Sequence, residues 1–405
     1  MKLKRINVAD TKFSIPLILV IFLCWLAEFA IGVSFFSIPP IINEIKKSFI
    51  ISNAEVGLLL ACPNISFIFF SFLIGILVDK WGSYKSSLIS LGLMAIAGIL
   101  KGLSVNYWQF LVLTFIQSFS VLIIGPAIIK TIKSKFPKQH YGKATGIVST
   151  GMATGIIFVF FLTPLIHFFW KWIILLYSSI PLLVLVVYLS NRSIIESSDQ
   201  LTEQNFAFSS IIIKDWRVYC IGLFYFVTTF IYFGLTSWLP QFLEQKNFPF
   251  QSSWASALMI LTGIFSAIVI PSIFDRLKNK IFFIRIVMIS LGLSIYFLIK
   301  ISGVYIIFVI AFIGVCNGPM RPMLNVMAMH LVNKKQEIGK IMGLLLTLGN
   351  IGGFLGSWLI GLIRDINHSF FYGFFLLTIL SIIVAVIPIK SWKMEEDKRY
   401  SMVKN

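Results

Sequence analysis

Long apolar stretches separated by short polar interruptions run through almost the whole chain. Runs long enough to cross a bilayer as helices lie near 14–38, 53–78, 84–104, 108–132, 142–166 and 171–190, and again near 218–242, 252–274, 281–300, 304–331, 338–363 and 369–390. A membrane-spanning helix needs about 20 predominantly apolar residues, because the hydrocarbon core is roughly 30 Å thick. The twelve runs therefore predict twelve transmembrane helices in an all-α integral membrane protein.

The longest polar interruption, "NRSIIESSDQLTEQNFAFSSIIIKD", divides the runs six and six. We therefore expect an N-terminal six-helix bundle over 1–190, a linker over 191–214, and a C-terminal six-helix bundle with a short tail over 215–405. The halves resemble each other, since "GKATGIVSTGMATG" from Gly142 matches "GKIMGLLLTLGNIGG" from Gly339 and a Gly-Pro pair precedes each. Two pseudo-symmetric six-helix bundles are the architecture of transporters that alternate around a midplane site.

Composition supports a membrane protein and excludes a β-barrel. Of 405 residues, 58% are hydrophobic and only 12% are charged, with a mean hydropathy of +0.92. A soluble domain carries about 25% charged residues. The strands of a transmembrane barrel alternate apolar and polar residues over about ten positions, and runs such as "IIFVFFLTPLI" do not alternate.

The formal charge of +18 is distributed unevenly along the chain. The terminal tails and the loops after the second, fourth, sixth, eighth and tenth runs carry 26 of the 34 Lys and Arg residues, whereas the opposite loops carry 7. Cytoplasmic loops are enriched in Lys and Arg, so we expect both termini and the linker to be cytoplasmic, in a bacterial cytoplasmic (inner) membrane. Because the positive charge is explained by this topology, we expect no nucleic-acid partner.

Catalytic and metal chemistry have no candidates in the sequence. The cysteines lie inside apolar runs without CxxC spacing, the four histidines are scattered, and no P-loop is present. Asn64-Ile65-Ser66 matches a glycosylation acceptor, but it lies inside a predicted span and carries no weight. We therefore expect no enzyme activity, no cofactor and no metal, and we take the chain to be a monomer in the lipid bilayer.

A small polar segment, "GILVDKWGSYKSS" at 75–87, lies between the second and third runs. It resembles the signature loop of the major facilitator superfamily, and the residues that match are Gly75, Leu77, Asp79, Lys80 and Gly82. The span count, the repeated halves and the central linker extend this resemblance to essentially the whole chain. Ser83 and Tyr84 stand where the family has basic residues, so the positive part of the loop is thinner than usual.

The resemblance implies that this loop gates the cytoplasmic side. It places Asp79 opposite the start of the eleventh span near Gly339, where free backbone N–H groups attract a carboxylate. Gly75 and Gly82 would let the backbones approach and turn. We therefore expect a cytoplasmic gate formed by Gly75, Asp79, Lys80, Gly82 and Gly339.

The fourth and fifth spans match the family less closely. Thr114 replaces an arginine that is common in the fourth span, whereas Gln117, a candidate for substrate binding, remains. In the fifth span no proline follows Gly151, although many antiporters have one there, and this favours uptake over drug export. We expect four glycines to pack helices together: Gly151, Gly155, Gly349 and Gly353.

Two charged residues lie deep inside predicted spans, where an ionised side chain costs about 2.5 to 3.5 kcal/mol unless it faces a cavity or a partner. Glu28 lies in the first span and Arg321 in the tenth. Asn317, Arg321 and Asn325 recur every four residues and so share one helix face. An arginine on that face could bind a carboxylate or another oxyanion through its fork of donors.

A second polar face lies on the seventh span, where Tyr225, Thr229, Tyr232 and Thr236 recur at helical spacing. The family resemblance implies that the first, fourth, seventh and tenth spans line a central cavity. Tyrosine and threonine also pack between membrane helices without any transport role. Glu28 has two interpretations: it could take up and release a proton as the cavity alternates, or it could form an ion pair with Arg321.

These features predict a secondary transporter that moves a small organic solute, anionic or zwitterionic, by alternating access with proton-coupled symport. The coupling ion could instead be another cation. An alternative is a proton-driven antiporter that exports a cationic or lipophilic compound, with Glu28 as its cation and proton site. A different class is a non-transporting membrane receptor that has kept the transporter fold, since a fold alone does not prove activity.

Overall fold

A computed structural model describes residues 15–137, 140–166, 168–195, 216–248, 252–277, 279–330 and 335–387. The regular structure of these residues is entirely helical. Eleven helices among them are long and apolar enough to cross a membrane, and Phe371–Val386 is a shorter apolar helix. Together they match the twelve predicted runs and confirm the all-α membrane fold.

The N-terminal bundle contains six long helices: α1 (Ile15–Phe36), α3 (Asn53–Trp81), α4 (Ser83–Gly102), α5 (Tyr107–Lys135), α6 (Tyr141–Leu162) and α7 (Trp170–Ser190). Four short helices accompany them: η1 (Pro39–Ile41), α2 (Ile42–Phe49), η3 (Thr163–Leu165) and α8 (Arg192–Ile195). α8 begins the predicted linker, and the remainder of the linker lies outside the described residues.

The C-terminal bundle contains α9 (Trp216–Gln245), α10 (Ser252–Phe274), α11 (Lys280–Lys300), η4 (Gly303–Tyr305), α12 (Ile306–Asn317), α13 (Met320–His330), α14 (Lys335–Asn367) and α15 (Phe371–Val386). The predicted tenth span is therefore two helices, separated at Gly318-Pro319. Proline has no backbone N–H to continue the helical hydrogen bonds. The break lies directly before Arg321.

The polar segment at 75–87 is helical except for one residue. Its first part ends α3 and its last part begins α4, and Gly82 alone joins the two helices. Gly82 has a φ of 80°, which favours glycine because a side chain there is strained. A glycine at this position therefore permits the chain to reverse between two membrane-spanning helices without a longer loop.

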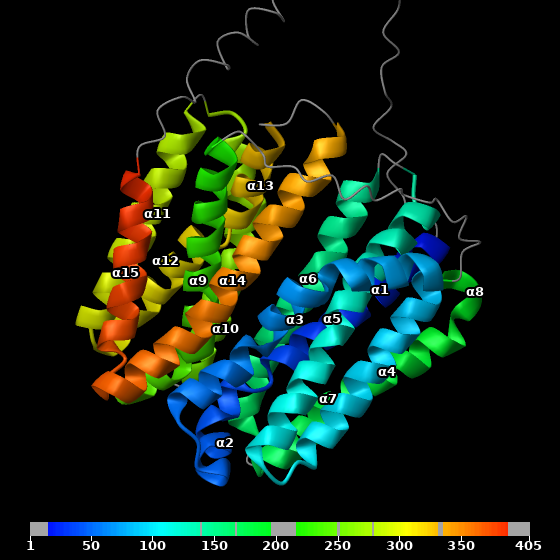
Figure 1. Ribbon diagram of the computed structural model, residues 1–405, viewed down its shortest axis with the longest axis horizontal. Helices are drawn as coiled ribbons and strands as arrows, with labels where there is room; N and C mark the ends of the chain where they lie inside the picture. The colour runs from blue at the N-terminus through cyan, green and yellow to red at the C-terminus, as the bar shows by residue number, and fades with distance from the viewer. Residues whose placement is uncertain are drawn as a thin grey trace, which may run out of the picture.

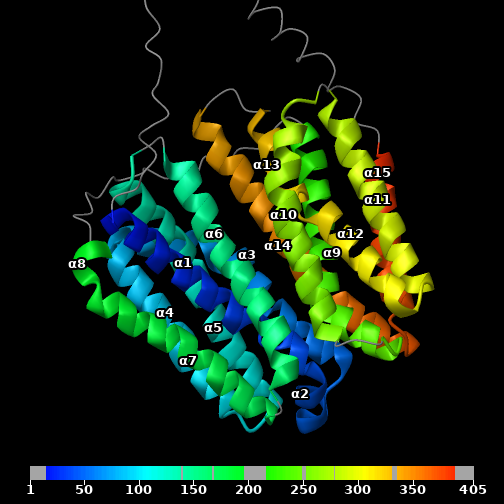
Figure 2. The same cartoon turned by 180° about the vertical axis from the view of Figure 1, so that it is seen from behind.

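The two bundles lie side by side, and α3 and α14 cross between them (Figures 1 and 2). α3 and α14 are antiparallel and pack closely at the end of the molecule where α3 begins: a methyl group on Gly57 would meet the backbone of Ser357, and one on Gly353 would meet Asn64. A methyl group on Gly75 or Gly343, towards the other end of this pair, would have nothing within 4 Å. We call the first end, with α2, the closed end, and the second, with Gly82, the open end.

Polar contacts hold the two bundles together at the closed end. The Asp365 carboxylate on α14 accepts hydrogen bonds from the Asn53 and Ala54 backbone amides at 3.0 and 2.7 Å, and from the Asn53 side chain. Asn43 donates to Glu244, and Gln241 donates to the Pro39 carbonyl. Asp365 thus satisfies the amides at the start of α3, which have no partner within the helix.

Glycines form two equivalent contacts, one within each bundle. In the N-terminal bundle, α6 packs on α1, and added methyl groups on Gly151 and Gly155 would overlap the Trp25 and Phe29 carbonyls. In the C-terminal bundle, α14 packs on α9 in the same way through Gly352 and Gly356. We call these contacts the glycine seams. Two other predicted packing glycines, Gly349 and Gly353, lie beside Tyr225 and beside Asn64 with Phe233.

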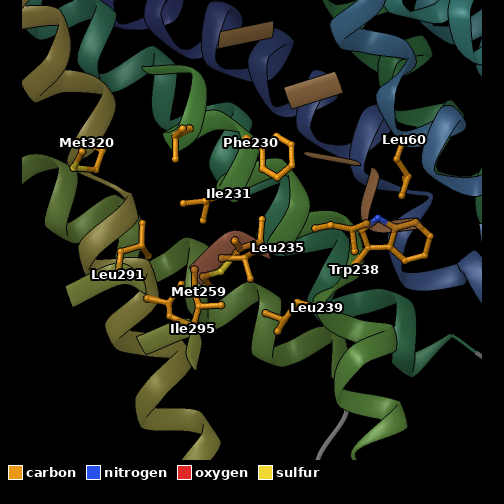
Figure 3. Close-up of a cluster of buried hydrophobic side chains, with 14 of the residues drawn as sticks. Leu60, Phe230, Ile231, Leu235, Trp238, Leu239, Met259, Leu291, Ile295 and Met320 are labelled. Carbon is orange, nitrogen blue, oxygen red and sulfur yellow. The ribbon is translucent and has the colours of Figure 1, made fainter. Parts of the chain in front are cut away.

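The largest buried apolar cluster is built around α9 and includes residues of both bundles (Figure 3). Leu235, Trp238 and Leu239 of α9 pack in it with Leu60 of α3 and Met259 of α10. The Trp238 indole N–H donates to the Ser357 carbonyl at 2.8 Å, so its polar atom is satisfied within the cluster.

Candidate functional site

A central cavity of about 240 Å³ lies between the bundles. Residues of both bundles line it: Ile31, Phe35, Phe36, Pro39, Leu60, Pro63, Asn64, Phe67, Val121 and Met152 from the first, and Tyr225, Thr229, Phe233, Ser237, Arg321, Leu346, Gly349 and Asn350 from the second. Drug-sized ligands occupy pockets of roughly 300–1,000 Å³. This volume suits a small organic molecule.

A side cavity of about 200 Å³ adjoins the central cavity at Arg321. Its walls come from α6, α9, α10, α12 and α13 with the turn before α13, and its lining residues are Ala153, Tyr232, Leu235, Met259, Ile260, Gly263, Ile264, Ala267, Gly314, Asn317, Gly318 and Arg321. Since Arg321 lines both cavities, its side chain stands at the boundary between them.

The Arg321 guanidinium is held by aromatic rings. It lies 4.6 Å from the centre of the Tyr232 ring and 5.7 Å from that of Phe233. One of its terminal nitrogens is buried without a hydrogen-bond partner. A buried, unpaired donor is costly, so the guanidinium is prepared for an acceptor that enters the cavity.

Two further buried donors lack partners at these cavities. They are the side-chain amide nitrogens of Asn64 in the central cavity and of Asn317 in the side cavity. Asn64 is 2% exposed and Asn317 is 7% exposed. All three unpaired groups donate hydrogen bonds, so the cavities suit a solute rich in acceptors.

The polar face predicted on the seventh span divides between the two cavities. Tyr225 and Thr229 line the central cavity, and Tyr232 lines the side cavity. The Thr229 hydroxyl donates to the Tyr225 carbonyl at 2.9 Å, and the Thr236 hydroxyl donates to the Tyr232 carbonyl at 2.7 Å. The hydroxyl protons of both threonines are therefore used within α9.

Glu28 lines neither cavity, but it shares a face of α1 with two residues that line the central cavity. It precedes Ile31 by three residues and Phe35 by seven, and both line the cavity. Residues at this spacing share a helix face. Its Cβ atom lies 3.0 Å from the position of a Cβ added to Gly151, so Glu28 packs against the α6 seam. No ion pair joins Glu28 to Arg321, both of which the structure describes.

Gln117 points into the N-terminal bundle and lines neither cavity. It is 1% exposed and accepts a hydrogen bond from the Lys101 ammonium at 2.7 Å, while its amide nitrogen donates to the Met94 carbonyl at 3.1 Å. Lys101 is also 1% exposed and lies 5.8 Å from the centre of the Phe110 ring. Asn325 is half-buried on α13 and likewise lines neither cavity. The structure therefore does not bring Gln117 or Asn325 to the predicted binding site.

The predicted gate residues lie at the open end. Asp79 is 54% exposed and pairs with Lys130 of α5 at 3.8 Å. The Lys130 ammonium also donates to the Asp79 carbonyl at 3.1 Å. Lys80 is exposed, and Gly339 lies in the first turns of α14. Lys130 thus supplies the cation that the loop lacks at Ser83 and Tyr84.

The family follows from a comparison with known protein families. Residues 24–357 match the model of the Major Facilitator Superfamily, which covers most of the chain. The chain belongs to the Major Facilitator Superfamily. Its members are membrane transporters rather than enzymes, so this chain is a multi-pass membrane transporter that binds a small-molecule substrate in a lipid bilayer.

Curated relatives in the superfamily are distant. Multidrug resistance protein 2 of Bacillus subtilis (strain 168) is 24% identical over 347 residues, which cover 82% of this chain and 85% of that protein. A quinolone resistance transporter of Acinetobacter baumannii is 22% identical over 400 residues, covering 86% and 87% of the two chains.

Solved structures of the superfamily share the fold. A bacterial homologue of the human lysosomal transporter Spinster, in an inward-facing and occupied conformation, superposes with a TM-score of 0.77 at 13% identity and covers 92% of this chain and 96% of its own. The xylose transporter XylE from E. coli, in an inward open conformation, gives a TM-score of 0.74 at 14% identity, covering 95% and 99%.

Sequence reasoning missed three residues of interest. Asn64 and Asn350 line the central cavity, and Lys101 is buried in the N-terminal bundle. The available signal was a lone polar side chain within an apolar run, which favours a cavity or a buried contact. The pattern could not indicate which of these environments each residue has.

Proposed function

We propose that this transporter moves a small organic solute, anionic or zwitterionic, by alternating access around the central cavity. The observation that carries the proposal is the Arg321 guanidinium, which lines the cavity between the bundles and has a buried nitrogen without a partner. Arginine binds carboxylates and other oxyanions through its fixed fork of donors. The unpaired amide of Asn64 on the other bundle supports a solute that contacts both halves.

We further propose that the open end faces the cytoplasm, so that the structure represents an inward-facing state. Basic residues at this end of the molecule favour this orientation: Lys80 in the last turn of α3, Lys133 and Lys135 in the last turn of α5, and Arg276 after α10. To face outwards, the transporter would close the open end and release the polar contacts of Asp365, Glu244 and Gln241 at the closed end.

The register between α3 and α14 supports the gating role of Asp79. Gly353 lies beside Asn64, and the two helices are antiparallel. Asp79 lies fifteen residues after Asn64 on α3. If the same register continued, Asp79 would lie opposite the position fifteen residues before Gly353 on α14. That position is next to Gly339, in the first turn of α14. The free backbone N–H groups there would donate hydrogen bonds to the carboxylate. In this proposal Asp79 exchanges Lys130 for the start of α14 when the gate closes.

We assign proton coupling to Glu28. It shares a face of α1 with two residues that line the central cavity, has no basic partner among the described residues, and is the one acidic residue within the described part of α1. A carboxyl group in this place can exchange a proton with the cavity. Its contact with the α6 seam could transmit the change in charge to the packing of α1 on α6.

A second candidate is proton-driven export of a lipophilic compound through the same cavity. Two relatives carry names for resistance to drugs or quinolones, which favours export. Phenylalanines of the central cavity, including Phe35, Phe67 and Phe233, suit an apolar or aromatic solute. Glu28 would then be the proton site of an antiporter.

Transport by the purified protein in proteoliposomes tests these proposals. The assay measures uptake of radiolabelled organic acids, amino acids and lipophilic cations with an imposed pH gradient of either sign. Symport predicts that acid outside the vesicle drives accumulation, whereas antiport predicts that acid inside drives it. No transport of any compound by well-folded protein would favour the receptor alternative.

The variant Glu28→Gln tests the coupling residue. We expect it to abolish accumulation driven by a pH gradient and to retain exchange of labelled for unlabelled solute, because the amide cannot carry the proton. Glu44→Gln is the matched control, since Glu44 is exposed on α2. Unchanged pH dependence in Glu28→Gln would exclude Glu28 as the coupling group.

A further inference from the structure

The side cavity has one polar wall and otherwise small or apolar walls. Arg321, Asn317 and Tyr232 supply the polar groups. Space beside them is created by residues with little or no side chain: Ala153, Gly263, Ala267, Gly314 and Gly318. The cavity is therefore shaped to admit a compact group next to two hydrogen-bond donors that have no partner.

The close packing of α12 on α10 fixes this geometry. A methyl group added to Gly314 or Gly318 would overlap the α10 backbone at Met259 or Gly263, so the two helices are in direct backbone contact. Asn317 lies between these glycines in the sequence, at the last turn of α12, and Arg321 follows in α13. Helix packing and the break at Pro319 therefore set the separation of the two donors.

The charges at the two cavities favour an anion over a zwitterion. Arg321 is the charged residue that lines them, and no acidic residue lines either cavity within the described part of the chain. The ammonium group of a zwitterion would lose its water without gaining a carboxylate, which is unfavourable in a site of low polarity. A single negative group, in contrast, would neutralise Arg321.

Resting on the proposed function, we propose that the side cavity holds the oxyanion of the substrate, a carboxylate, between Arg321 and Asn317. The apolar body of the substrate, of the size of one ring, occupies the central cavity among Phe35, Phe67 and Phe233. The substrate class is thus a small aromatic or alicyclic monocarboxylic acid. The Tyr232 ring lies 4.6 Å from the guanidinium and restricts its movement, which would help Arg321 to receive the carboxylate.

Three probes with the same ring and different charges test this assignment. Binding of benzoate, benzamide and benzylamine to the purified full-length protein is measured by isothermal titration calorimetry. We expect benzoate to bind at least about tenfold more tightly than benzamide, because its hydrogen bonds to arginine are charge-assisted. Benzylamine should bind most weakly. Equal binding of benzoate and benzamide, tighter binding of benzylamine, or no binding of benzoate would overturn the proposal.

Two variants locate the carboxylate. Asn317→Ala removes one donor and should reduce the preference for benzoate over benzamide about tenfold. Asn367→Ala, at an exposed position at the end of α14, is its control. Ala267→Leu fills the side cavity and should reduce benzoate binding with Asn317 intact. Val269→Leu enlarges an exposed side chain of the same helix and should not. Size-exclusion profiles of all variants check folding.

The outcomes separate this inference from the proposed function. If acids bind with the expected preference but are not transported in proteoliposomes, the site assignment stands and the transport proposal fails. If acids are transported while Asn317→Ala and Ala267→Leu leave the preference for benzoate unchanged, the transport proposal stands and the side cavity is not the carboxylate site.

Discussion

At the scale of single residues, arginine and lysine have different tasks in this transporter. Arg321 lines both cavities and stacks on Tyr232, a geometry that uses its planar guanidinium. Lys101 is enclosed in the N-terminal bundle, where Gln117 accepts its hydrogen bond. One cation therefore faces the two cavities, while the other belongs to the packing of α4 on α5.

Replacing Arg321 by lysine should raise the KM for transport by about tenfold or more. The ammonium keeps the charge but loses the second donor of the fork and the stacking on Tyr232, and a cation–π contact contributes about 0.5–2 kcal/mol. Tyr232→Phe keeps the ring face and is the matched control, with a small effect expected. Initial rates of uptake over a range of solute concentrations give the KM of each variant. An unchanged KM in Arg321→Lys would show that stacking and fork geometry are not needed.

The pair of Lys101 and Gln117 should behave as a structural unit. Gln117→Leu leaves a buried ammonium without its acceptor, which is expected to destabilise the protein by about 1.5–3 kcal/mol. Lys101→Met combined with Gln117→Leu removes both polar groups and should restore most of the Tm. The Tm of each variant is measured by thermal unfolding in detergent. If Gln117→Leu instead changed the KM for solute at an unchanged Tm, Gln117 would belong to the substrate site.

At the scale of helices, α3 and α14 form the main contact between the two bundles. Their packing is tight at the closed end and absent around Gly75, so the pair can pivot. Asp365 is placed to resist this motion, because it joins the start of α3 in one bundle to the end of α14 in the other.

Asp365→Ala should shift the population towards the state in which the closed end is open. The variant loses charge-assisted hydrogen bonds to Asn53 and Ala54, each worth about 1.5–3 kcal/mol. Spin labels at Ile50 and Ile366, both exposed at the closed end, report the distance between bundles, and the four native cysteines are buried. Asp275→Asn, an exposed acid elsewhere, is the control. An unchanged distance distribution would show that the hydrogen bonds of Asp365 do not hold the two bundles together at the closed end.

The sequence predicted the positions of the helices well, but it did not predict which side of each helix faces the cavity. Apolar runs gave the spans because length and hydropathy alone decide whether a segment can cross a bilayer. The break in the tenth span falls at Gly318-Pro319, the Gly-Pro pair that precedes the second repeat. Gln117 was predicted to bind substrate but lies inside its bundle, and Asn64 was given no role but lines the central cavity. In a uniformly apolar helix no periodicity indicates which side faces the cavity. Helix packing decides it.

At the scale of the whole molecule, the two ends use acidic residues in opposite ways. At the closed end Asp365 connects the bundles, whereas at the open end Asp79 pairs with Lys130 inside its own bundle. If Asp79 is shared between Lys130 and the start of α14, Lys130 stabilises the open gate by competition.

The variants Lys130→Ala and Asp79→Ala should therefore move the gate in opposite directions. Loss of Lys130 frees Asp79 for α14 and favours closure, whereas loss of Asp79 removes the latch and favours opening. Alkylation of Leu346→Cys measures the change, because Leu346 is exposed and lines the central cavity. We expect slower alkylation in Lys130→Ala and no slowing in Asp79→Ala. The same direction of change in both variants would contradict the exchange of partners.

The glycine seams bear on how such a transporter can diversify. At each glycine of the seams, the backbone of a neighbouring helix occupies the space that a side chain would need; these glycines are Gly151 and Gly155 on α6, and Gly352 and Gly356 on α14. A larger residue would push the two helices apart and disturb the packing of the whole bundle. Cavity residues such as Asn64 can change one at a time. In a saturation library selected only for correctly inserted protein, the four seam positions should tolerate almost no replacement, while the cavity varies freely. Specificity for new solutes would then evolve through the cavity residues, while the packing of the helices stays the same.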